Sequence, residues 1–134
     1  METAVESKKP VVWMGSSLGD LQAMSDAVKS AIGGSLRMVQ FGLTPFNAKP
    51  MTGFSSDGVF EIRENDFGDT YRAVYAVKIS DCLYVLHVFK KKSTQGDNTP
   101  KIEMDAIQSR LKDARQHAEQ QSRAQKTASK KKKK

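Results

Sequence analysis

Positively charged side chains recur at the ends of three strand-like segments in the middle of this 134-residue chain. Arg63 ends the first segment, Arg72 opens the second, and the third contains His87 and ends in Lys90-Lys91-Lys92. If the segments pair as consecutive antiparallel hairpins, the arginines and the lysines meet at one end of the sheet. Fixed cations stabilise negative charge on a phosphate, and a histidine or a lysine can transfer a proton. The candidates for catalysis are therefore Arg63, Arg72, His87, Lys91 and Lys92.

Each of these residues also has a structural interpretation. Arg63 lies among four acidic residues between positions 61 and 69, so a surface ion pair is an alternative to a phosphate contact. His87 has apolar neighbours on both sides, which is also the setting of a hydrogen-bonded core histidine. The run Lys90–Lys92 could instead be a solvated strand end, or a set of charges that protects a sheet edge from aggregation.

The chain offers little for other chemistries. Its single cysteine, Cys82, and its two histidines, His87 and His117, do not have the spacing of metal ligands, so we expect no metal and no cofactor. One cysteine cannot form a disulfide within the chain, which favours a reducing compartment. No apolar run approaches 18 residues or follows the N-terminal charges, so we expect neither a membrane span nor a secretory signal. These features predict a cytoplasmic protein.

The formal net charge of +7 is distributed unevenly along the chain. Residues 1–100 contain 11 basic and 11 acidic side chains, whereas residues 101–134 contain 11 basic and 4 acidic ones. The predicted fold is therefore neutral overall, and its basic character comes from the C-terminal part, which ends in Lys130–Lys134. A functional site must consequently be argued from local clusters of charge, because net charge says nothing about fold or site.

Periodicity indicates the elements that position the candidate residues. Short apolar or alternating runs predict strands at 11–14, 59–64, 71–79 and 83–89. Possible caps at Ser16 or Ser17 and at Ser25 predict a helix pair that ends at Gly42, and the spacing of Val28, Ile32, Leu36 and Val39 makes them the inward positions of its second helix. A last helix should start at Pro100. Residues 43–58 hold two prolines and two glycines without periodicity, and we expect a loop there.

The expected fold is α+β, with a small, mainly antiparallel sheet of four strands packed by the N-terminal helix pair and by the C-terminal helix. Within this sheet Tyr71 and Tyr75 share the face opposite Arg72, and we expect both in the core. The last helix loses its apolar stripe near Ala114, so frayed helix should pass into disorder beyond it. The predicted division is a flexible N-terminus at 1–8, one domain at 9–114 and a polar, Lys-rich tail at 115–134.

Four segments of the sequence, in this order, resemble one known family. They are Lys9 to Ser16 (KPVVWMGS), Glu61 to Asn65 (EIREN), Tyr71 to Tyr75 (YRAVY), and Leu86 to Ser93 (LHVFKKKS) leading to Thr99-Pro100-Lys101. The stretch from Lys9 to Leu111 is similar to the phage-derived Gp49-like branch of the RelE/ParE toxin superfamily, to which HigB-type toxins belong. The order of the four segments makes the resemblance specific.

The resemblance implies a RelE-like fold and the toxin of a type II toxin–antitoxin system. Such a toxin is a ribosome-dependent mRNA endoribonuclease, which cleaves without a metal by attack of a 2′-hydroxyl on the adjacent phosphate. Its partners would be the ribosome, mRNA and a cognate antitoxin, often a helix-turn-helix protein, that blocks the site. Arg72 matches the family's Tyr-Arg-x-Val-Tyr motif. The expected contacts to nucleic acid are Lys78, Lys90, Lys91 and Lys92.

Two other functions stay open at this point. The superfamily contains members that inhibit DNA gyrase without cutting RNA, and it contains others with no demonstrated activity. An inactive phage-derived interaction protein would use Arg63 and Arg72 only for ion pairs with the acidic residues around them. The run Lys130–Lys134 could add non-specific affinity for ribosomal RNA, or it could be a disordered tail that keeps the protein soluble.

Overall fold

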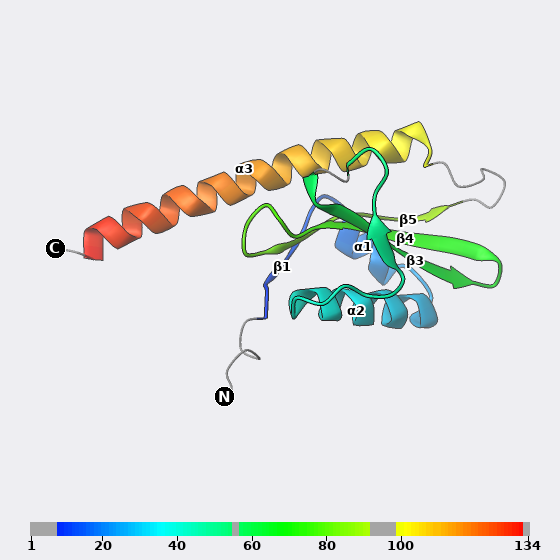
Figure 1. The fold of residues 1–134 in the computed structure, drawn as a ribbon. Helices are drawn as coiled ribbons and strands as arrows, with labels where there is room; N and C mark the ends of the chain where they lie inside the picture. The colour runs from blue at the N-terminus through cyan, green and yellow to red at the C-terminus, as the bar shows by residue number, and fades with distance from the viewer. Residues whose placement is uncertain (1–7, 55–56, 92–98, 133–134) are drawn as a thin grey trace, which may run out of the picture.

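The computed structural model describes residues 8–54, 57–91 and 99–132, with side chains as far as Lys126. One sheet lies between helices in an α+β arrangement, with α2 on one face and α3 on the other (Figure 1). The elements are β1 (Val11–Trp13), α1 (Ser17–Gln22), α2 (Asp26–Gln40), β2 (Ala48–Pro50), β3 (Val59–Asp66), β4 (Asp69–Ala76), β5 (Leu83–Lys91) and α3 (Lys101–Lys132). The α+β class and the helix pair are confirmed.

The sheet has five strands rather than the four that we predicted, in the order β1-β5-β4-β3-β2. The additional strand, β2, pairs antiparallel with the edge of β3 inside the segment expected as a loop. Three residues that end in Pro50 are too short to show an alternating pattern, and proline is tolerated at a sheet edge. The sheet is also mixed, because β1 pairs parallel with β5. No local turn links these two strands, so the sequence could not fix their direction.

The α2 face of the sheet holds one of the two apolar clusters of the core. Ser25 caps α2 by accepting a hydrogen bond from the backbone N–H of Val28 at 3.3 Å, as the capping pattern predicts. The predicted inward positions of this helix are buried, and they are Val28, Ile32, Leu36 and Val39. Tyr75 lies in the same cluster, where burial raises its pKa to about 12, and half-buried Tyr71 packs against it. Both tyrosines therefore lie on the core side, as expected.

A β-bulge in β5 decides which side chains face α3. Val74 of β4 pairs with His87, but the next residue, Tyr75, pairs with Val85, so Leu86 is an extra residue in the ladder. A bulge of this kind puts two consecutive residues on one face of a strand. Leu86 packs in the cluster under α3, and His87 bonds to α3 as well. The alternation predicted for this strand is therefore interrupted at the histidine.

Helix α3 continues well past the point where its apolar stripe ends. It runs to Lys132 and projects beyond the sheet in Figure 1, whereas the sequence predicted frayed helix and disorder after Ala114. Two contacts fix its middle part, because Arg115 pairs with Asp57 at 2.6 Å and His117 bonds the Tyr84 hydroxyl at 3.0 Å. Gln, Ala, Arg and Lys also favour helix formation without a packing face. The functional division into 9–114 and 115–134 stays a prediction.

In the described part of the chain, no helix has the length and apolar character needed to cross a membrane.

The packing of α2 gives a first testable prediction. Ile32→Ala should lower the free energy of unfolding by about 2–5 kcal/mol, because Ile32 is fully buried and its truncation leaves a cavity. Urea denaturation measures this loss. The control is Ile102→Ala on α3, which should change stability by less than about 0.5 kcal/mol because Ile102 is 75% exposed. Equal losses in the two variants would contradict the assigned core.

Candidate functional site

The strand register places the polar candidates in rows across the face that α3 covers. One row contains Lys49 of β2, Glu61 of β3 and His87 of β5, with Val74 of β4 between the last two. The next row pairs Arg63 with Arg72, and Arg72 with Phe89. A third row contains Asn65, Thr70 and Lys91. The predicted meeting of both arginines at one end of the sheet therefore occurs, on one face.

The centre of this face is the carboxylate of Glu61. Arg63 donates from Nε to Glu61 Oε1 at 2.7 Å, and Arg72 donates from Nη1 to Oε2 at 3.5 Å. Lys49 Nζ lies 3.9 Å from Oε1. The side chains of Glu61 and Arg72 are only 4% and 2% exposed, so the charges compensate each other away from bulk water. Arg72 also donates to the hydroxyl of Thr99, just before α3, at 3.2 Å.

A cavity of about 400 Å³ opens beside this carboxylate. It lies where β2, β3 and β4 meet the start of α3. The lining residues are Lys49, Met51, Thr52, Glu61, Arg63, Arg72, Thr99 and Met104. Three of the lining side chains are cationic and one is anionic, so the cavity is locally positive within a neutral domain. A guanidinium presents several N–H donors in a fixed fork, which suits a phosphate group.

His87 is held between two charged side chains of α3. Its Nε2 lies 2.7 Å from Glu103 Oε1, and its Nδ1 lies 2.7 Å from Arg110 Nη1. Arginine can only donate, so Nδ1 must accept and the proton of the neutral ring sits on Nε2, where it is donated to Glu103. The ring also stacks on Phe89 with centroids 5.0 Å apart. His87 is thus buried and hydrogen-bonded on the same face as the arginines.

Arg110 extends this network to the N-terminal part of the fold. It donates to the backbone carbonyl of Leu86 at 3.1 Å and to the hydroxyl of Ser16 at 3.2 Å. Gly15, with φ of +53°, lies directly against this guanidinium, since a Cβ at that position would come 2.4 Å from Nε of Arg110. Only a residue without a side chain fits there, so Gly15 makes room for the arginine.

The four lysines that we predicted to contact nucleic acid do not lie together in one cluster. Lys91 is buried on the α3 face, one row beyond Arg72. Lys90 points to the opposite face and pairs with Asp69 at 3.1 Å, and this hydrogen bond raises the pKa of Lys90. Lys78 is exposed beyond the other end of β4, far from the arginine end. Lys92 lies outside the described residues.

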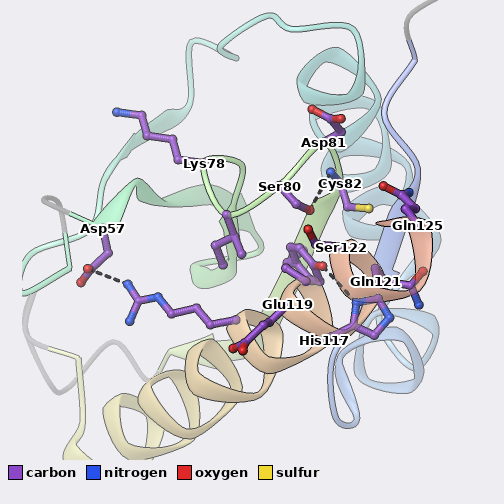
Figure 2. A pocket seen from close by; sticks show the side chains of 14 residues that line it. Asp57, Lys78, Ser80, Asp81, Cys82, His117, Glu119, Gln121, Ser122 and Gln125 are labelled. Carbon is purple, nitrogen blue, oxygen red and sulfur yellow. Dashed lines mark hydrogen bonds and ion pairs between the residues drawn. The ribbon is translucent and has the colours of Figure 1, made fainter. Parts of the chain in front are cut away.

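A second, larger hollow of about 860 Å³ lies at the Lys78 end of the sheet (Figure 2). The β4–β5 connection and the outer half of α3 line it. Arg115 donates to Asp57 across one side at 2.6 Å, and Figure 2 marks this bond by the dashed line at Asp57. His117 bonds Tyr84, and Cys82 is half-buried nearby. Acidic and basic side chains are mixed around this hollow. The smaller cavity, with its three cations, is therefore the better match for a phosphate.

Several residues of the site were not among the sequence candidates. Glu61 was considered only as an ion-pair partner for Arg63, although the two share a strand face because they are two positions apart. Glu103 and Arg110 lie on the same helical face as Ile107, so the apolar stripe of α3 could have indicated that they point to the sheet. In the described ranges, no group of three or more histidine, cysteine and carboxylate side chains is arranged to hold a metal ion.

Comparison with known proteins places this architecture in a family. The family model described as "Phage derived protein Gp49-like (DUF891)" matches residues 19–112, a region that includes Glu61, both arginines and His87. No curated protein and no solved structure was found to match the chain. The Gp49-like family lies within the RelE/HigB-like toxin superfamily and is associated with the toxins of toxin–antitoxin systems. Because the match covers well over half of the chain, the protein belongs to the Gp49-like family of phage-derived proteins.

Proposed function

We propose that this protein is the toxin of a type II toxin–antitoxin system and that it cleaves mRNA on the ribosome. The observation that carries the proposal is the cavity in which Arg63 and Arg72 share the carboxylate of Glu61. Preorganised cations of this kind stabilise a phosphorane because they need no reorganisation as charge develops. The association of the Gp49-like family with toxins supports the same conclusion.

In the proposed reaction the scissile phosphate binds to Arg63 and Arg72, with Lys91 adding positive charge from the next row. Glu61 accepts the proton of the 2′-hydroxyl. The bond between O2′ and phosphorus forms, and the bond between phosphorus and O5′ breaks. The products are a 2′,3′-cyclic phosphate and a 5′-hydroxyl, once the leaving oxygen has taken up a proton.

His87 is proposed to supply that proton. It lies in the same row as Glu61, with Val74 of β4 between them, so acid and base share the row next to the arginines. To donate a proton and end as a neutral ring, His87 must first be the imidazolium cation with hydrogen on both nitrogens. Because Arg110 can only donate, it must leave Nδ1 before that nitrogen takes up a proton from solvent. An RNA phosphate competes for the Arg110 guanidinium, because arginine binds phosphate in a bidentate manner. RNA binding would then release the histidine for acid catalysis.

The same ion pairs also favour a second candidate function. Arg63 and Arg72 bind Glu61 as the structural interpretation requires, so an inactive interaction protein would show this arrangement too. Such a protein would bind a cognate antitoxin, often a helix-turn-helix protein, without cutting RNA. Activity measurements on variants of the arginine and the carboxylate distinguish the two functions.

Removal of the buried arginine is expected to abolish most of the activity. Arg72→Ala should slow mRNA cleavage in a reconstituted translation reaction by about 100-fold or more, because the phosphorane loses a fixed cation. The control is Lys29→Ala on α2, which removes an exposed cation bound to Asp26 on the other side of the sheet and should leave the rate unchanged. Far-UV circular dichroism and thermal unfolding establish that both variants fold. An unchanged rate for folded Arg72→Ala would contradict the role of Arg72, whereas the absence of cleavage by the wild type would favour the inactive protein.

The carboxylate gives an independent prediction. Glu61→Gln keeps the size of the side chain and an oxygen that accepts from Arg63, but it removes the proton acceptor. Cleavage should fall by about 100-fold, within the range that a general base contributes. Wild-type products should carry 2′,3′-cyclic phosphate ends, which mass spectrometry of the fragments detects. Wild-type activity in Glu61→Gln, or 3′-hydroxyl products, would contradict the role of Glu61.

A further inference from the structure

Phe67 occupies an unusual position at the tip of the β3–β4 hairpin. The pairing of Asp66 with Asp69 leaves a two-residue loop formed by Phe67 and Gly68. Both residues have positive φ, +50° for Phe67 and +84° for Gly68. The side chain of Phe67 is 98% exposed. A large aromatic residue therefore combines a left-handed backbone with almost no packing.

This combination is unfavourable for the fold alone. Two-residue hairpin loops with two positive φ angles strongly prefer Asn-Gly or Asp-Gly, because a bulky side chain crowds the backbone in the left-handed region. Phe67 gains nothing in return from burial, since its ring lies in solvent. Strained positions of this kind cluster where a protein binds a ligand. The ring therefore points to a contact with another molecule.

The tip lies at the end of the sheet that carries the arginines. Arg63 precedes Phe67 by four positions, which corresponds to about 13 Å along a strand at about 3.3 Å per residue. The acidic residues that flank the loop are engaged, because Lys90 binds Asp69 at 3.1 Å and Ser25 donates to Asp66 at 3.2 Å. They therefore repel a nearby polyanion less than two isolated carboxylates would.

A second exposed ring lies at the same edge. Phe46 is 99% exposed, and the residue after it, Asn47, is bonded to the backbone of Arg63. The N–H of Arg63 donates to the Asn47 carbonyl at 3.1 Å, and Asn47 Nδ2 donates to the Arg63 carbonyl at 3.2 Å. Among the described large apolar side chains, Phe46 and Phe67 have the highest exposure. Exposed rings beside fixed cations are the usual pattern of single-stranded nucleic-acid binding.

The geometry points to Phe67 as a stacking platform for a base of single-stranded RNA whose phosphate binds at Arg63 and Arg72. This inference rests on the proposed function for the identity of the substrate. Stacking on an aromatic ring tolerates different bases, because every base has a π face. Phe67 would therefore position the RNA strand along the sheet edge and would set only a weak sequence preference.

The test uses the full-length protein and a 12-nucleotide single-stranded RNA that contains 2-aminopurine. Phe67→Asn supplies the residue that the turn prefers but cannot stack, whereas Phe67→Trp keeps an aromatic face. The Asn variant should bind the RNA about 5- to 150-fold more weakly by fluorescence anisotropy, the range expected for loss of one stacked base. It should also lose the quenching of 2-aminopurine. The Trp variant should retain both affinity and quenching.

Thermal unfolding separates a binding role from a structural one. The Asn variant should melt at the wild-type temperature or above it, because the strained residue is replaced by a favoured one. The control is Leu43→Asn, which removes an exposed apolar side chain beside Val77 and Lys78 at the other end of the sheet, and it should bind RNA as the wild type does. A lower melting temperature for Phe67→Asn would overturn the inference.

Two further results would also overturn it, namely unchanged RNA affinity in Phe67→Asn, or a loss confined to binding of an antitoxin. Failure of the stacking inference can be distinguished from failure of the proposed nuclease function. RNA binding that depends on Phe67, without mRNA cleavage, would support the stacking site and contradict the nuclease. Cleavage by the wild type together with unchanged affinity in Phe67→Asn would support the nuclease and contradict the stacking site.

Discussion

The buried carboxylate of Glu61 organises the face of the sheet that α3 covers, because its negative charge must be compensated by cations. Glu61 binds Lys49 from β2, Arg63 from its own strand and Arg72 from β4, so a single negative charge connects three strands. An uncompensated charge in this environment would cost several kcal/mol, and the cations are therefore fixed whenever the domain is folded. The same constraint that stabilises the fold thus provides a preorganised group of cations, which is what stabilisation of a phosphorane requires.

The bulge at Leu86 brings His87 to the same face of the sheet as Glu61 and the arginines. Without the extra residue, the alternation from Val85 would direct His87 towards the α2 face, together with Ala73. With it, His87 faces α3 and meets Glu103 and Arg110. An irregularity of one residue therefore determines whether the row that contains Glu61 also contains a histidine. Bulges often serve this purpose beside functional sites.

Local patterns in the sequence predict those parts of the fold that depend on neighbouring residues. The cap at Ser25 and the buried stripe of α2 are examples, and the short hairpin that brings Arg63 opposite Arg72 is another. Period-two alternation also separates Lys90 from Lys91, although treating Lys90–Lys92 as one cluster hid this distinction. Predictions failed where distant segments decide the outcome. The edge strand β2 and the parallel pairing of β1 depend on partners far along the chain.

The extent of α3 and the bulge illustrate two further limits. The helix continues after its apolar stripe because Arg115 and His117 find single polar partners, Asp57 and Tyr84, that no periodicity indicates. The bulge is invisible in the sequence because Leu86 and His87 both suit a buried strand. The central role of Glu61 was missed for a different reason. It was weighed as an alternative to phosphate binding by Arg63, as if one function excluded the other.

The ion pairs and phosphate binding are in fact compatible on chemical grounds. A guanidinium has five N–H donors in one plane, so it can bind a carboxylate along one edge while another edge faces an anion. Arg63 uses Nε for Glu61, and its side chain still lines the cavity together with Arg72 and Lys49. These three cations outnumber the one carboxylate, so the cavity stays positive even with the ion pairs intact. Glu61 then acts both as the group that holds the arginines and as a base placed beside the phosphate that they bind.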